Sequence, residues 1–404
     1  MPRYLLLLLP LLLAADWPQH LGPTRDGHSP ETKLLREWPK DGPKQLWTAN
    51  VGTGWSGPVA VGGKVLLHHR VGDDEVLQCW NAADGKEVWK YAVATGYTDD
   101  YFPADDGPRA TPAVVGNHVF TLGPDGKLSC VTLDKGERVW DRDLSKDYPF
   151  KKGYFGLAPS PLVDDERVYV NVGSPGAGVV AFDRKSGKEV WKSSDDEASY
   201  SSPVLTTLAG KPQLVCFTRA GLLVLEPATG KQLHAMPFRA RIQASVNAAT
   251  PLVSGDRVFL TSSYNVGAIL LEAGTDGWKS IWKNDKSLSA HYNTPVKVGE
   301  LLYGVDGRQE SGAELRCVEW ATGTVRWTKP GFGCASLIVA DGLLIAVVES
   351  GDLVLIEASA EGYREKGRFA GLTKPVRAAP ALADGRLFAR DGKKLAAWLV
   401  KLVK

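Results

Sequence analysis

Aromatic, cationic and polar residues recur at a matched place in successive segments of the sequence, close before a short alternating run that usually contains proline. The candidate binding residues are Trp55, Arg109, Tyr200, Asn247, His291, Tyr292, Asn293 and Arg377. Two guanidinium groups beside one indole would suit a flat anionic ligand, which could stack on the ring while its carboxylates pair with the arginines. The tyrosines and their polar neighbours could contact a neutral part of such a ligand. The alternative is that the same residues plug a channel and hydrogen-bond to backbone carbonyls.

Other familiar site chemistry is not found in the sequence. It has no G-x-S-x-G or H-E-x-x-H motif, so we predict no catalytic residue and no metal ligand. The segment 97–109, YTDDYFPADDGPR, carries four aspartates, but their spacing matches no EF-hand loop. We expect a solvated acidic loop there; the alternative is a loop over the mouth that recruits Ca²⁺ or a partner.

A repeated motif indicates which elements must position these residues. ADGKEVWK (83–90) and KSGKEVWK (185–192) share a glycine followed four residues later by tryptophan. Glycine suits the turn because it accepts a positive φ without steric conflict, and the tryptophan can wedge against the next repeat. The tryptophans expected to dock neighbouring repeats are Trp47, Trp89, Trp140, Trp191, Trp282 and Trp327.

Each copy begins with small residues and an alternating apolar run, and eight such starts recur about every 45 residues, the size of a four-stranded propeller blade. Alternating β-branched runs joined by Gly, Asn and Asp turns indicate strands. The eighth unit lacks its fourth strand, which KQLWTANV (44–51) can supply. The sequence therefore predicts an all-β, eight-bladed β-propeller of four-stranded antiparallel blades, in which the N-terminal strand closes the ring. Its central axis would gather the candidate binding residues at one mouth.

The runs CWNAADGKEVWK (79–90) and AFDRKSGKEVWK (181–192) resemble the repeat of the pyrroloquinoline-quinone (PQQ) propellers. That family includes quinoprotein dehydrogenases, which hold PQQ and Ca²⁺, and a lipoprotein that serves as a protein-binding scaffold. The adjacent Cys–Cys pair of most alcohol-oxidising members is absent here. The resemblance therefore favours a non-catalytic binding scaffold without a cofactor. The alternatives are a PQQ- and calcium-dependent oxidoreductase and a glycan-binding module.

The ends and the charge of the chain suggest where it works. Leu5–Leu13 is an apolar run after Arg3, so residues 1–15 read as a secretory signal peptide. Residues 16–43 would form an arm that caps the propeller, and residues 44–404 the propeller itself. The formal net charge is only +2, which gives no reason to expect nucleic acid as a partner. We expect a secreted or periplasmic monomer without a membrane span, which binds a protein or a small anionic or carbohydrate ligand at the central funnel.

Overall fold

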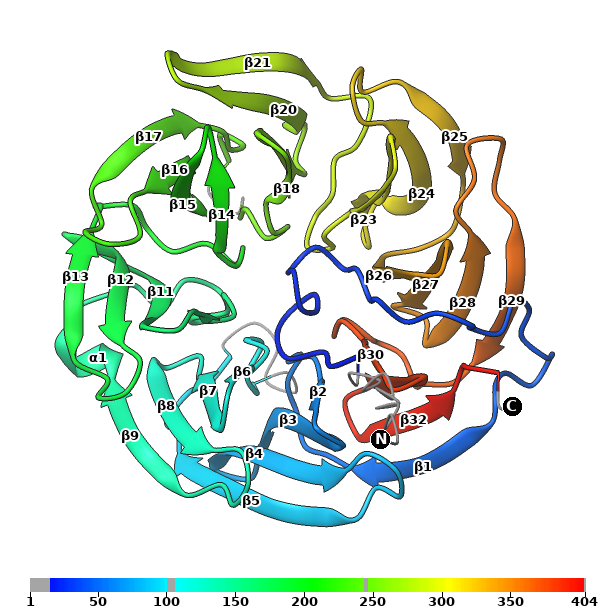
Figure 1. Ribbon diagram of the computed structural model, residues 1–404, viewed down its shortest axis with the longest axis horizontal. Coiled ribbons are helices and arrows are strands. Elements are labelled where there is room, and N and C mark those ends of the chain that lie inside the picture. The colour runs from blue at the N-terminus through cyan, green and yellow to red at the C-terminus, as the bar shows by residue number, and fades with distance from the viewer. Residues whose placement is uncertain (1–14, 100–105, 243–245, 403–404) are drawn as a thin grey trace, which may run out of the picture.

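The computed structural model describes residues 15–99, 106–242 and 246–402. Within these ranges the strands form eight four-stranded sheets, which stand as blades around a ring (Figure 1). The predicted all-β, eight-bladed propeller is therefore confirmed. The one helix in the described ranges is α1 (Leu144–Asp147), a single turn that follows the second blade. The predicted signal peptide falls almost wholly outside the described residues.

The first four blades run from the inner to the outer strand in chain order. Blade 1 contains β2 (Val59–Val61), β3 (Lys64–Val71), β4 (Asp74–Asn81) and β5 (Glu87–Ala94). Blade 2 contains β6 (Ala113–Val115), β7 (His118–Leu122), β8 (Lys127–Thr132) and β9 (Arg138–Asp143). Blade 3 contains β10 (Leu162–Val163), β11 (Arg167–Ser174), β12 (Ala177–Asp183) and β13 (Glu189–Ser193). Blade 4 contains β14 (Val204–Leu208), β15 (Lys211–Phe217), β16 (Gly221–Leu225) and β17 (Gln232–Pro237).

The remaining blades repeat this order, with one exception in blade 8. Blade 5 contains β18 (Leu252–Ser254), β19 (Arg257–Ser262), β20 (Gly267–Gly274) and β21 (Gly277–Asn284). Blade 6 contains β22 (Val296–Val298), β23 (Leu301–Arg308), β24 (Gly312–Glu319) and β25 (Val325–Lys329). Blade 7 contains β26 (Ala335–Ala340), β27 (Leu343–Val348), β28 (Asp352–Glu357) and β29 (Glu365–Ala370). Blade 8 contains β30 (Ala381–Ala383), β31 (Arg386–Arg390), β32 (Lys394–Leu399) and, as its outer strand, β1 (Gln45–Asn50).

The N-terminal strand closes the ring as predicted. Strand β1 pairs antiparallel with β32, so that Trp47 lies opposite Ala397 and Asn50 opposite Lys394. This pairing covers an edge of β32 that would otherwise present unpaired backbone groups.

The middle strands of each blade are buried on both faces, whereas the outer strands bury little besides tryptophan. In β12 six of seven residues are buried, while in β13 only Trp191 is. Adjacent blades thus pack face to face through their middle strands, and most outer strands dock through one large side chain, a tryptophan or, in β29, Phe369.

The docking tryptophans reach across to the next blade. Their indole Nε1 atoms donate hydrogen bonds of 2.8–3.0 Å to carbonyl oxygens in the following blade. The donor–acceptor pairs are Trp47–Ala82, Trp89–Leu133, Trp140–Arg184, Trp191–Pro227, Trp282–Trp320 and Trp327–Ser359. The repeat glycine lies against the incoming indole: at Gly187, with φ of +69°, a Cβ would lie 2.7 Å from the Trp140 ring. The Gly-to-Trp motif therefore joins each turn to the blade before it.

The N-terminal arm, residues 16–43, crosses the centre of the ring without regular secondary structure, and it is the dark blue trace in Figure 1. Trp17 exchanges backbone hydrogen bonds with Ala60 in blade 1, and Gly27 and Ser29 bond to Val339 in blade 7. The arm buries four large apolar side chains to 1–6% exposure: Trp17, Leu21, Leu34 and Trp38. It is therefore packed into the propeller and covers one end of the central channel.

Candidate functional site

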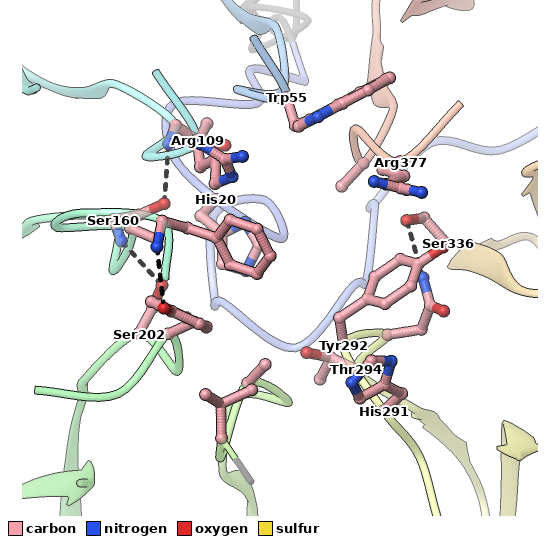
Figure 2. Close-up of a pocket in the computed structure, with 18 of the residues that line it drawn as sticks. His20, Trp55, Arg109, Ser160, Ser202, His291, Tyr292, Thr294, Ser336 and Arg377 are labelled. Carbon is pink, nitrogen blue, oxygen red and sulfur yellow. Dashed lines mark hydrogen bonds between the residues drawn. The ribbon is translucent and has the colours of Figure 1, made fainter. Parts of the chain in front are cut away.

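A central cavity of about 400 Å³ occupies the ring axis. It is lined mainly by the loops that precede the inner strands and also by the β19–β20 and β23–β24 turns, which carry Tyr264, Gln309 and Glu310. His20 and Leu21 of the arm line it as well, and Figure 2 shows His20 behind the wall residues. The cavity is therefore a funnel closed by the arm on one side, and we refer to it as the funnel. A volume of this size lies within the usual range for small-ligand sites.

The structure brings together most of the residues that the sequence singled out. Those that line the funnel are Trp55, Arg109, Tyr200, His291, Tyr292, Asn293 and Arg377. Asn247 is the exception. Its side-chain amide donates to the carbonyls of Thr218, at 2.9 Å, and Phe238, at 3.1 Å. Asn247 thus ties neighbouring loops together behind the lining.

Arg377 lies over the indole of Trp55, with 5.4 Å between its guanidinium carbon and the ring centroid. Its Nε donates to Glu349 Oε1 at 3.0 Å. The carboxylate fixes the plane of the guanidinium and balances its charge. Figure 2 shows Trp55 between Arg377 and Arg109 along the rim.

Arg109, which the sequence placed beside the same indole, stacks instead on Phe155, 4.5 Å from its ring centroid. Its Nη2 donates to Asp99 Oδ2 at 2.9 Å. Asp99 is 2% exposed, so the expectation of a solvated acidic loop is wrong at this residue. A buried carboxylate needs a partner, and Arg109 is that partner. Residues 100–105 of the loop lie outside the described residues.

The opposite wall carries uncharged rings. The ring of His291 lies edge-on to Tyr264, with centroids 5.5 Å apart, and Arg308 lies 4.3 Å above the Tyr264 ring. Burial lowers the pKa of His291 and raises the pKa of Tyr200 and Tyr292. These side chains are therefore neutral near pH 7.

A series of hydroxyl groups joins adjacent blades near the inner strands. Oγ atoms of Thr111, Ser160, Ser202 and Thr294 each accept a backbone N–H from the preceding blade at 2.8–3.0 Å, and Ser336 accepts from Asn293 Nδ2 at 3.3 Å. We call these five residues the hydroxyl belt. All five line the funnel. Because each hydroxyl accepts in these bonds, its own proton remains to be donated.

Sequence reasoning missed the belt, although a signal was present. Thr or Ser directly precedes the start proline in five units, as in ATP, PSP and NTP. It also missed Phe155 and the arm residue His20, which lie outside the repeated strands, and Tyr264, which lies in the turn between β19 and β20.

The arm is anchored beside the belt by Arg25, which is 3% exposed. Its two terminal nitrogens donate to the carbonyls of Ser160 and Pro161 at 3.1 Å. His20 stands nearby, with its Nε2 3.5 Å from Thr250 Oγ1. Burial, and then the charge of Arg25, lowers the pKa of His20 to about 3.

Acidification should therefore weaken the folded state through His20. Below pH 6.5 the unfolded chain binds a proton that the folded chain takes up only near pH 3, so folding stability falls with pH across this window by up to about 1.4 kcal/mol per unit. Because part of the ring faces the funnel, we expect about half of the full effect. Between pH 7 and pH 5, the His20→Gln variant should lose about 1 kcal/mol less than the parent chain in urea titrations. Equal losses in the two proteins would contradict this assignment.

A family model described as outer membrane protein assembly factor BamB matches residues 39–146 and 100–329. The chain belongs to the BamB family. The predicted membership among PQQ-like propellers is confirmed. Similar relatives include BamB of Burkholderia pseudomallei, 25% identical over 317 residues that span 69% of this chain and 79% of the relative. They also include quinohemoprotein alcohol dehydrogenase ADH-IIG of Pseudomonas putida, 26% identical over 139 residues, 33% of this chain and 18% of the enzyme.

Solved structures share the architecture of this BamB-family protein. BamB from Moraxella catarrhalis aligns with a TM-score of 0.63 at 14% identity, over 89% of this chain and 98% of that one. The quinohemoprotein alcohol dehydrogenase of Comamonas testosteroni aligns with a TM-score of 0.70 at 13% identity, over 96% and 81%. At these identities the likeness establishes the propeller fold alone.

Two further findings apply to the described part of this BamB-family chain. Its residues contain no group of three or more His, Cys, Asp or Glu side chains placed to hold a metal ion. They also contain no helix long and apolar enough to cross a membrane.

Proposed function

We propose that this protein is an exported, non-catalytic binding scaffold that receives a segment of a partner protein in the funnel. The observation that carries the proposal is the composition of the funnel wall, where several aromatic rings lie beside two arginines that are each paired with a carboxylate. Trp, Tyr and Arg are enriched where protein partners make their strongest contacts. The relatives named as outer membrane protein assembly factors support a partner protein and a periplasmic location. We expect the scaffold to act as a monomer.

The second candidate is a quinoprotein oxidoreductase. Trp55 under Arg377 could stack on a flat cofactor, and relatives include quinohemoprotein alcohol dehydrogenases. PQQ is flat and carries three carboxylates, so it requires positive charge that is not already compensated. Arg109 and Arg377 are each paired with a carboxylate, Asp99 and Glu349. The lining therefore fits PQQ with calcium poorly.

A blocked funnel should separate these possibilities. Ala248 lines the funnel, so Ala248→Trp would fill it without changing the arginines. Val190 is 46% exposed on outer strand β13, so Val190→Trp adds the same indole outside the site. Peptides selected from a random library on the parent chain should bind Val190→Trp normally and bind Ala248→Trp at least about 10-fold more weakly, a loss of about 1.4 kcal/mol.

Equal binding of the selected peptides to Ala248→Trp would contradict the proposed site. The oxidoreductase would instead be favoured if PQQ with CaCl₂ bound the parent chain at micromolar concentration, gave a changed quinone absorbance and failed to bind Ala248→Trp.

A further inference from the structure

Three arginine planes lie on three aromatic rings around the mouth of the funnel. The pairs are Arg377 on Trp55 at 5.4 Å, Arg109 on Phe155 at 4.5 Å and Arg308 on Tyr264 at 4.3 Å. They come from separate parts of the ring: blades 8 and 1, blades 2 and 3, and blades 5 and 6. The mouth therefore presents flat, weakly hydrated groups from several directions, which is a surface suited to another flat group.

Two of these three planes, Arg109 and Arg377, are paired with carboxylates, and a further carboxylate, Glu310, lines the funnel. Asp99 is 2.9 Å from Arg109, and Glu349 is 3.0 Å from Arg377. The rings of His291, Tyr200 and Tyr292 are neutral, because burial lowers the pKa of the first and raises the pKa of the others. A guest with net charge would have to disturb these pairs, whereas an uncharged ring can stack without doing so. The wall thus selects for planarity rather than charge.

The depth of the funnel adds a second requirement. The arm closes one end with His20 and Leu21, and the volume of about 400 Å³ admits the tip of a chain rather than a chain that passes through. Toward the inner strands the lining changes from rings to the hydroxyl belt, whose O–H groups can donate to an oxygen of the guest. A guest that fits both zones has a flat body and an oxygen at its far end.

We propose that the funnel recognises an uncharged aromatic side chain at the tip of the partner segment, and tyrosine in preference to phenylalanine. The ring stacks among the arginine planes, and the phenolic oxygen accepts a hydrogen bond from the belt. This inference rests on the proposed function, since it specifies which part of a partner protein enters the site.

The test measures the binding of small neutral probes to the full chain by calorimetry or ligand-observed NMR. N-acetyl-tyrosinamide should bind more tightly than N-acetyl-phenylalaninamide, and N-acetyl-leucinamide should bind at least about 10-fold more weakly than the tyrosine probe. Arg377→Lys keeps a cation opposite Glu349 but loses the planar face, so it should weaken the tyrosine probe about 3- to 10-fold. Phe155→Leu should weaken it similarly, whereas the matched variant Phe155→Tyr, which retains a ring, should not.

Equal binding of the leucine and tyrosine probes would overturn the inference. Binding of maltose, a probe for a glycan site, when none of the three amides binds would also overturn it. Failure here is distinguishable from failure of the proposed function. If library peptides are excluded by Ala248→Trp but show no aromatic residue in common, the scaffold stands and the aromatic guest does not. If Ala248→Trp excludes no peptide, both are wrong.

Discussion

A chain that lacks residues 16–52 should form soluble aggregates instead of a folded monomer. The deletion removes β1, which pairs with β32 and carries Trp47 against the turn of blade 1. The edge of β32 would then be open to pairing with other chains, a recognised route to aggregation. Size-exclusion chromatography with light scattering, together with a thermal melt, measures the outcome.

The matched control deletes only residues 16–43 and leaves β1 in place. The repeat pattern by itself predicts an intact ring for this variant. The structure adds that the arm buries Trp17, Leu21 and Trp38, and each such side chain contributes about 1.5–3 kcal/mol when buried. We therefore expect a monomer that melts at a clearly lower temperature. If the longer deletion remained monomeric with an unchanged melt, β1 would not be what closes the ring.

Replacing Trp140 with alanine should lower the free energy of unfolding by about 3–5 kcal/mol, the range for emptying a large aromatic site. The indole is 9% exposed, packs against Gly187 of the next blade and donates to the carbonyl of Arg184 at 3.0 Å. Denaturant titration gives the midpoint and the slope, from which the free energy follows.

The neighbouring residue provides the control for this substitution. Val139 is 40% exposed on the same outer strand, β9, and Val139→Ala should change stability by no more than about 0.5 kcal/mol. Equal midpoints for the two variants would remove the argument that the tryptophans dock the blades.

The fold could be predicted because each unit repeats the same pattern of strands and turns. The Gly-to-Trp spacing marks one turn and one outer strand at a time, and the missing strand of blade 8 is recognisable as residues 44–51. Mouth residues such as Trp55 and Arg377 followed from their fixed offset to the inner strands, because the same offset in each blade leads to the same height on the axis.

Other parts of the site could not be predicted, because they lie where the repeat is interrupted. The partners of Arg109, Asp99 and Phe155, come from inserted loops of irregular length. The path of the arm depends on many tertiary contacts, such as the hydrogen bonds of Arg25 to the loop before blade 3. The repeat pattern of the sequence gives no indication of these contacts. Asn247 lies close in sequence to residues that line the funnel, but its side-chain amide donates hydrogen bonds to backbone carbonyls of neighbouring loops instead.

The pairing of β1 with β32 also affects when the ring can close during folding. During synthesis the strand that emerges first must wait for nearly the whole chain before its partner exists, and contacts of such high sequence separation form slowly. Until then the blades form an open row with an unpaired edge, and the funnel has no complete wall. The ring, and with it the wall of the funnel, is therefore complete only after the first strand and the last strand of the propeller have met.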